Sequence, residues 1–567
     1  MRAIRNRITQ SASTRRGRAI MGGIFLVLVI TVILTIVYWN AIKKQLIRDH
    51  VKLKVREKTE RLYNIHYSNM ELDEVGGNLS IANLTLQYDS ARYLKLKGKK
   101  EEPPMLFRIE IPSITVTGIQ TPKALLTQEI VGTKLQINRP VIEILYTHRK
   151  KNANRRVPPG EVYKQILGEL ERIKIDTLLI VDAQIITKNM QTGKQELQLT
   201  DTDMELRDVA IDSVTSRDSS RILFSKQLFV SCSALLWSSP DQLYTYKVDN
   251  INMHSAYQQI NAERFRIIPA LSETEFAAKK AMQTDRFNID IEQISFHRIN
   301  FQHLMREELI ADSLMIGSAS FKIYRDMTMP PDSSSKIGTY PHQRVVEIPF
   351  PLEIKKMIVS NSFVEYKEKG RLLQKIGKVT FGNVNAVVSN VTNKKQSPQK
   401  IMTADIYARF LNKFPVQTLW TFYLFNTKGR FDIKGHLGAL NATALNAIIE
   451  PLGGARVKEG RIRDLEFNFK GYDYGMDGTV KLLYDDLKVA LLKKDKDTKA
   501  LKEKKLLSWG ANMFIKDANP SKGEAPGIVD VHFDRVINRS IFHLSWKTLF
   551  DGVKETALPP KKEKMNE

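Results

Sequence analysis

The chain contains a single cysteine, Cys232, among 567 residues. No disulfide can therefore form within it, and a chain of this length buries enough core to fold without one. Because apolar residues flank Cys232, we expect a buried thiol. The motifs of zinc proteases, serine hydrolases, redox dithiols and nucleotide-binding proteins are also absent, and the ten histidines are scattered. The sequence therefore predicts no enzyme: no catalytic residue, no metal site and no cofactor.

Charged side chains are missing from residues 19–42. A helix of this length crosses a hydrocarbon layer of about 30 Å. Arginines and no acidic residue precede it, which predicts a cytoplasmic N-terminus and an extracytoplasmic bulk. A cleaved signal peptide is the alternative, but its apolar run would be shorter and small residues would follow. The residues expected to anchor this single-pass helix are Ile20, Phe25, Leu28, Ile33, Tyr38 and Trp39.

The formal net charge is +25, and local clusters of Lys and Arg recur along the chain. A basic surface attracts either anionic membranes or nucleic acid. Because the predicted topology keeps the bulk away from cytoplasmic nucleic acid, phospholipid head groups are the expected partner and nucleic acid is not. Solvated loops that only keep the protein soluble remain an alternative for each cluster.

Apolar and polar residues alternate with a period of two from about Tyr63 onward. Short runs of this kind are typical of strands with one buried and one wet face, so we expect a mainly β protein. Only a few short helices interrupt the pattern, and a Ser272–Glu275 capping box marks one of them. The expected helices are 161–172, 272–282, 300–308, 442–449 and 506–515.

The sequence also repeats itself. Ile109–Ile119 matches Ile289–Ile299 at an offset of 180, and Ile173–Lys188 matches Leu352–Lys367 at an offset of 179. Both copies change phase at the same place, since apolar positions 109 and 111 give way to 114 and 116. A change of phase turns side chains to the other face unless a bulge or tight turn absorbs one residue. A second change is expected at Arg139–Pro140.

Duplicated strands with duplicated kinks predict an elongated, curved, antiparallel-rich sheet with a groove, built from repeats; a closed sandwich is the alternative. The expected divisions are a basic cytoplasmic tail (1–18), the transmembrane helix (19–42), a first β unit (43–245), a second β unit (246–400), a C-terminal β unit (401–490), and a charged linker, helix and tail (491–567).

One pattern suggests an enzyme. Asp201-Thr-Asp203 is the D-x-D arrangement with which membrane-anchored glycosyltransferases hold a metal on a nucleotide sugar, because two such carboxylates share a divalent ion. A nucleotide site of that kind needs alternating helices and strands, which this chain lacks. We therefore interpret the pattern as an ordinary strand edge.

The apolar faces of the expected strands must be covered, and the few short helices do not suffice. Acyl chains gain roughly 0.8 kcal/mol per buried methylene, so an open apolar groove could carry lipid. A closed protein core is the alternative. The residues expected to line the groove are Ile114, Val116, Leu135, Ile137, Ile144, Ile294, Phe296, Ile316 and Phe321.

Several segments resemble a known family. After the basic tail and anchor come Gly77–Leu84, Ile111–Ile119, Ile137–Ile144 and Ile180–Ile185, and Val457–Leu487 follows later. Together they resemble the AsmA-like, TamB-related proteins of Gram-negative bacteria. The segment Ser540–Gly552 is similar to the tail of Bacteroidota members. The resemblance covers most of residues 20 to 555, and its motifs are short and strand-like.

The resemblance implies an inner-membrane anchor, a periplasmic groove-forming β structure, and a role in phospholipid transport and outer-membrane homeostasis. It offers no catalytic residue. The expected partners are membrane phospholipids and outer-membrane assembly proteins, and the sequence leaves the oligomeric state open. The alternative function is a scaffold that binds envelope-assembly machinery through its sheet edges without transferring lipid.

Overall fold

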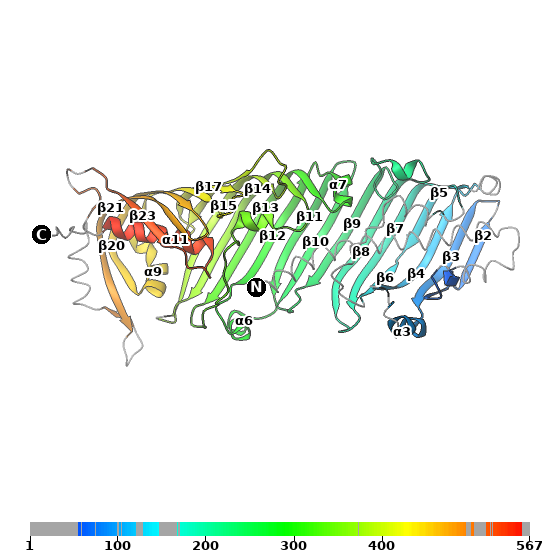
Figure 1. Cartoon of the computed structure of the whole chain (residues 1–567), viewed down its shortest axis with the longest axis horizontal. Coiled ribbons are helices and arrows are strands. Elements are labelled where there is room, and N and C mark those ends of the chain that lie inside the picture. Colours follow the sequence, from blue (N-terminus) through cyan, green and yellow to red (C-terminus); the bar gives the residue numbers. More distant parts are fainter. Residues whose placement is uncertain are drawn as a thin grey trace. The chain divides into compact units, whose positions relative to one another are not determined.

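The computed structural model describes residues 55–557 except 58, 74, 99, 100, 102, 104, 121–128, 147–166, 168, 169, 372, 495–500, 504–517, 522 and 524. The described chain is mainly β, with few and short helices, as expected (Figure 1). The predicted anchor, residues 19–42 with its six named side chains, lies outside the described residues. Among the helices that are described, none has the length and apolar character needed to cross a membrane.

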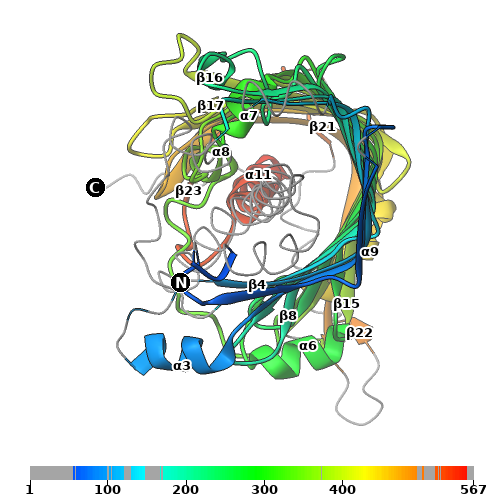
Figure 2. The same cartoon turned by 90° about the vertical axis from the view of Figure 1, so that its right-hand side faces the viewer.

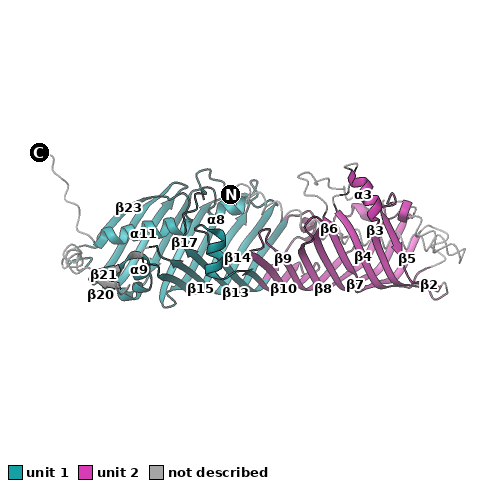
Figure 3. Cartoon of the chain, turned by 90° about the horizontal axis from the view of Figure 1, so that it is seen from below, with its two compact units in different colours: residues 1, 266–294, 309–567 teal, residues 2–265, 295–308 magenta. Residues whose placement is uncertain are grey.

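The chain divides into two compact units (Figure 3). Unit 1 comprises Met1, Arg266–Ile294 and Leu309–Glu567, and unit 2 comprises Arg2–Phe265 and Ser295–Glu308. Two strands, β11 (Gln259–Pro269) and β12 (Arg286–His297), contribute residues to both.

The strands of unit 2 form a serial ladder in which almost every strand pairs with the next one along the chain. β1 and β2 both pair with β3, and β5 and β6 occupy successive halves of one position between β4 and β7. The ladder consists of β1 (Tyr63–His66), β2 (Asn69–Asp73), β3 (Asn78–Tyr88), β4 (Met105–Thr117), β5 (Glu129–Asn138), β6 (Val141–Tyr146), β7 (Arg172–Asn189), β8 (Gln195–Ile211), β9 (Gln227–Ser238) and β10 (Tyr244–His254). The helices are α3 (Ser90–Gly98), η1 (Thr215–Arg217) and α7 (Phe301–Met305).

Unit 1 is built in the same serial manner, and β18 and β19 share one position beside β20. Its strands are β13 (Leu309–Asp326), β14 (Leu352–Lys369), β15 (Ile376–Thr392), β16 (Ile401–Phe410), β17 (Phe414–Tyr423), β18 (Phe431–Leu437), β19 (Leu440–Asn441), β20 (Ala455–Gly471), β21 (Gly475–Lys494), β22 (Leu501–Glu503) and β23 (Ile528–Asp534). Its helices are α6 (Glu273–Lys280), α8 (Pro341–Val346), η2 (Ala442–Leu445), α9 (Asn446–Gly453) and α11 (Ile541–Ala557).

The repeat seen in the sequence is present in the topology. β7 and β14 are both 18 residues long, and β8 and β15 are both 17 residues long. In each copy one pairing is parallel while its neighbours are antiparallel: β7 runs parallel to β5 and β6, and β14 runs parallel to β13. A parallel pair needs a long crossover connection, which residues 327–351 provide in the second copy. The parallel pairings were not anticipated from the sequence.

The predicted changes of phase are absorbed by local irregularities. In the first copy Asn83, with φ of 50°, and Pro112 are skipped between the pairs Ala82–Ser113 and Leu84–Ile111. Proline lacks an N–H group for the ladder and therefore suits such a place. As a result Ile109, Ile111, Ile114 and Val116 are all buried. The second predicted change falls at Arg139, with φ of 49°, between β5 and β6.

The second copy has matching irregularities. Gln293, with φ of 54°, lies between the apolar residues Ile291 and Ile294 of β12. Further along, Asp182 in β7 and Asn361 in β14 both have positive φ where the pairing with the following strand shifts register. We call these positions of positive φ, taken within each unit separately, the crease: Asn83, Arg139 and Asp182 in unit 2, and Gln293 and Asn361 in unit 1. It keeps the apolar side chains of each strand on one face.

Some of the predicted helices are confirmed, and others have different limits or lie outside the described residues. The capping box at Ser272 is confirmed, since its hydroxyl accepts from the N–H of Glu275 and the Glu275 carboxylate accepts from the N–H of Ser272. The helices at 300–308 and 442–449 exist with different limits, as α7 and as η2 with α9. Most of the helix predicted at 161–172 lies outside the described residues, and its expected last residue, Arg172, begins β7 instead. The helix predicted at 506–515 lies outside the described residues.

Candidate functional site

Rows of apolar side chains cross the sheet of unit 2 from strand to strand. Residues directly opposite each other in neighbouring strands point to the same side, so each row lies on one face. One row consists of Met70, Ile81, Ile114, Ile137, Ile180, Met204, Val230 and Met253. A second consists of Leu72, Leu79, Val116, Leu135, Leu178, Leu206 and Leu228. A third consists of Ile65, Leu86, Ile109, Ile142, Ile185, Leu199, Leu235 and Val248. We call this surface the apolar face of unit 2.

The structure brings five predicted groove residues together on this face. They are Ile114, Val116, Leu135, Ile137 and Ile144, and each is at most 2% exposed. Burying a side chain of this size contributes roughly 1.5–3 kcal/mol to stability. In the described structure these five residues therefore act as core.

The face becomes more open farther along the ladder. In the first row Ile81, Ile114 and Ile137 are buried, whereas Met204 and Val230 are half-buried, and Met253 on β10 is also half-buried. The first row therefore stays apolar along the ladder, while its side chains become more exposed to solvent. A ligand could therefore reach Met204, Val230 and Met253 of the first row, whereas Leu206 and Leu228 of the second row are buried on the same strands.

The other four predicted residues lie on strands of the second copy and are half-buried. Ile294 and Phe296 lie on β12. Ile316 is opposite Val359, and Phe321 is opposite Val364. Unit 1 has a row of the same kind, which consists of Leu314, Met357, Val388, Ala404, Trp420, Ile433, Phe469, Gly478 and Val531. We call this surface the apolar face of unit 1.

Helix α11 covers part of the apolar face of unit 1, and the sequence analysis missed it. Figure 2 shows α11 on the concave side of the curved strands of unit 1, where it packs against β21 and β23. Its buried side includes Ile541, Leu544 and Gly552. Apolar residues recur at helical spacing in 541–557, but Ser and Thr between them hid the signal.

The opposite side of α11 is apolar as well. Phe542, Trp546 and Phe550 follow one another at intervals of four residues and are 64%, 40% and 41% exposed. Residues at this spacing lie on the same helix face. The Phe542 ring meets the Trp420 ring edge-on at 6.2 Å between centroids. Together α11 and β17 therefore offer an accessible aromatic surface.

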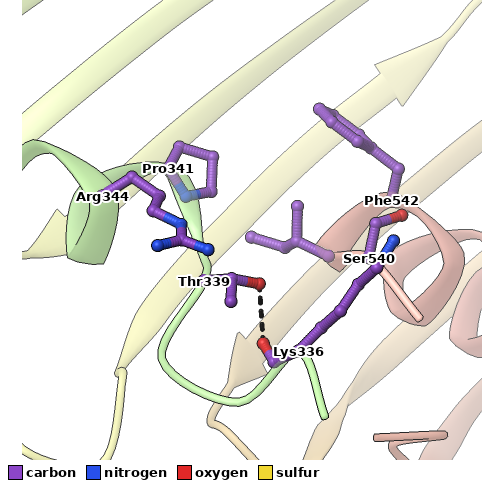
Figure 4. A pocket seen from close by; sticks show the side chains of 7 residues that line it. Lys336, Thr339, Pro341, Arg344, Ser540 and Phe542 are labelled. Atoms are coloured by element: carbon purple, nitrogen blue, oxygen red, sulfur yellow. Dashed lines mark hydrogen bonds between the residues drawn. The ribbon is translucent and has the colours of Figure 1, made fainter. Parts of the chain in front are cut away.

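A pocket of about 280 Å³ opens at the first turn of α11 (Figure 4). It lies between this turn and the crossover segment, residues 327–351. Its described lining residues are Lys336, Thr339, Pro341, Arg344, Ser540, Ile541 and Phe542. The pocket thus combines two cationic side chains with an exposed phenyl ring.

The surroundings of this pocket are electropositive. Burial holds the pKa of Lys336 below its usual value; the carboxylate of Asp285 opposes this effect, and the positive charges of Arg325 and Arg539 add to it. Burial and the same kind of neighbours, led by Arg539, lower the pKa of His543 to about 4. Burial is thus the main cause of both pKa shifts, and cationic neighbours add to it.

The aspartates of the D-x-D pattern lie next to the crease. Asp201 has φ of 46°, and an oxygen of Asp203 accepts from the backbone N–H of Asp182 at 2.8 Å. Both side chains are exposed on β8. The described residues contain no group of three or more His, Cys, Asp or Glu placed to hold a metal ion. Asp203 thus has a structural role at the kink.

Cys232 lies on β9 and is buried, as expected. Its thiol is 3.5 Å from the carbonyl oxygen of Thr200 and 3.3 Å from that of Ala234.

The comparisons with known proteins give no family. No protein-family model matches this chain, and no curated protein matches it. The resemblance to AsmA-like proteins therefore stays a prediction.

Proposed function

We propose that this protein is an AsmA-like, membrane-anchored periplasmic protein of Gram-negative bacteria that binds or conducts phospholipid along its apolar faces and supports outer-membrane homeostasis. In this proposal residues 19–42 hold the chain in the inner membrane as a single-pass helix. The chain works without a catalytic residue or cofactor.

The observation that carries the proposal is the continuity of the apolar rows. Each row of unit 2 extends over at least seven strands. If the rows served only as an enclosed core, they would not need apolar side chains at positions that are only half-buried, such as Met204, Val230 and Met253. Acyl chains would complete the burial of these residues at roughly 0.8 kcal/mol per methylene.

Site-specific photo-crosslinking in cells that express the full chain tests the proposal. A crosslinking residue at Met253 or at Ile316 should capture phospholipid. The matched controls are Asn252 and Met315, which precede them on the same strands, point to the opposite face and are exposed. Met315 is itself apolar, so it separates an effect of the face from one of hydrophobicity. Equal lipid capture at Met315 and Ile316 would contradict the proposal.

A scaffold for envelope-assembly proteins is the second candidate. The opposite face of unit 1 exposes Met315, Val387, Tyr407 and Leu419, each between 38% and 43% exposed. An apolar patch on a solvent-exposed face is typical of a surface that binds another protein. Crosslinks from Met315 to one stoichiometric protein, with no lipid captured at Ile316, would support this function instead.

A further inference from the structure

The pocket at the first turn of α11 is held by a network that joins distant segments of unit 1. The Arg535 guanidinium donates to the carbonyl oxygens of Lys336 at 2.7 Å and Asp473 at 3.1 Å, and it lies 4.2 Å from the centre of the Tyr340 ring. The amide of Asn538 donates to the carbonyl oxygen of Asp332 at 2.7 Å. The crossover segment is therefore fixed against the chain that leads into α11, and the pocket is preorganised.

The pocket has an unbalanced positive charge. None of its seven described lining residues is acidic. Lys336 is 3.3 Å from an oxygen of Asp285, but Arg325 binds the other oxygen of the same carboxylate at 2.9 Å. Arg344 pairs with Glu347, the residue that follows its helix α8. Lys336 and Arg325 thus share one carboxylate, and an anion in the pocket would meet the positive charge that this carboxylate leaves uncompensated.

The first turn of α11 adds donors. The backbone N–H groups of Ile541 and Phe542 come before the first intrahelical bond, in which Leu544 donates to the carbonyl oxygen of Ser540 at 3.2 Å. No described residue accepts from these two N–H groups. The N-terminus of a helix of 17 residues also carries the positive end of the helix dipole.

The apolar neighbour narrows the choice of ligand. Phe542 lines the pocket, is 64% exposed and reaches Trp420 on the apolar face of unit 1. A small inorganic anion would leave this aromatic surface in water. A molecule with a phosphate group and attached acyl chains would use both parts.

We propose that this pocket binds the phosphate of a phospholipid head group, with Lys336, Arg344 and the first N–H groups of α11 as donors, while Phe542 and Trp420 contact the acyl chains. The inference rests on the proposed lipid-binding function and names the place where unit 1 recognises the head group.

Binding of three probes to the purified full chain tests this inference. The probes are short-chain phosphatidic acid, short-chain phosphatidylcholine and inorganic phosphate. We expect phosphatidic acid to bind best and phosphate worst. The double variant K336Q/R344Q should bind phosphatidic acid about a hundredfold more weakly, about tenfold for each charge-assisted hydrogen bond that the substitution removes. The control K355Q removes an exposed cation on β14 that pairs with Asp312 and should bind as the wild type does.

A third variant separates the acyl part from the phosphate part. F542S changes an exposed side chain and should weaken phosphatidic acid binding without affecting phosphate binding. Thermal unfolding of each variant shows whether the fold is kept, and R344Q alone serves if K336Q disturbs the bond to Asp285. Unchanged phosphatidic acid binding in R344Q, or phosphate binding equal to that of phosphatidic acid, would overturn the inference.

The two proposals fail separately. If Ile316 and Met253 capture lipid while the pocket variants bind phosphatidic acid normally, the lipid function holds and the head-group site does not. If the variants lose phosphatidic acid but the crosslinks capture no lipid, the site is real and the extended lipid path is not.

Discussion

His342 provides the sharpest test of the packing in unit 1. It lies in α8 with no exposed surface, stacked on Phe422 at 5.1 Å between ring centres and next to Tyr340 and Phe431. Neither ring nitrogen has a hydrogen-bond partner among the described residues. Burial lowers the pKa of His342 to about 4. The folded protein therefore holds a neutral imidazole, and acid should destabilise it.

Proton linkage gives the direction and the size of this loss of stability in acid. The unfolded chain binds a proton at His342 below a pKa of about 6.5, whereas the folded chain does so only below about 4. The neutral imidazole of His342 therefore contributes its full stability above about pH 6.5, and this contribution is lost as the pH falls toward 4. The loss amounts to about 2 kcal/mol at pH 5 and approaches ~3 kcal/mol below pH 4.

The assay compares H342F with the wild type by denaturant unfolding of the purified full chain at pH 7.5 and at pH 5. At pH 7.5 the phenyl ring removes two unsatisfied nitrogens, a gain of about 1–3 kcal/mol, but its extra volume costs a similar amount. This packing effect cancels in the difference between the free energies of unfolding measured at pH 7.5 and at pH 5. The variant should lose about 2 kcal/mol less on acidification. His66, which is exposed on β1, gives the control H66Q. An identical pH dependence of H342F and the wild type would refute the reasoning.

Two further changes probe the packing of the faces. An alanine Cβ at Gly552 would lie 2.4 Å from a methyl carbon of Val480 and 3.0 Å from one of Val531. G552A should therefore loosen the packing of α11, although alanine favours the helix by about 1 kcal/mol. Faster hydrogen exchange in α11 would show this loosening. I137A should cost about 2–5 kcal/mol because Ile137 is fully buried, whereas M253A should cost clearly less because Met253 is half-buried; denaturant midpoints measure both, and equal losses would contradict the assigned exposures.

Much of the strand pattern could be predicted because it depends on local periodicity. The phase change between Ile111 and Ile114 predicted a kink, and the skipped Asn83 and Pro112 supply it. The nine predicted lining residues came from the same alternation. Cross-strand pairing places Ile114, Val116, Leu135 and Ile137 in the rows of the apolar face of unit 2, because a period of two fixes which side chains share a side. That the nine residues line a lipid groove stays a prediction.

The sequence did not reveal which strands pair or what covers them. The parallel pairing of β13 with β14 depends on the crossover segment, whose helix α8 is not among the expected helices. The pocket depends on Arg535, whose partners Lys336 and Asp473 are far away in the chain. Contacts over such separations leave no periodic trace in a single sequence.

The hydrogen bond of Asp203 has a counterpart in the second copy. There, the backbone N–H of Asn361 donates to the side-chain oxygen of Asn385 at 3.0 Å, as that of Asp182 donates to Asp203 at 2.8 Å. Duplication has thus placed a neutral amide where the other half of the molecule has a carboxylate. The position demands an acceptor oxygen and tolerates the absence of negative charge, so the need for an acceptor where the strand bends is enough to explain the carboxylate of Asp203.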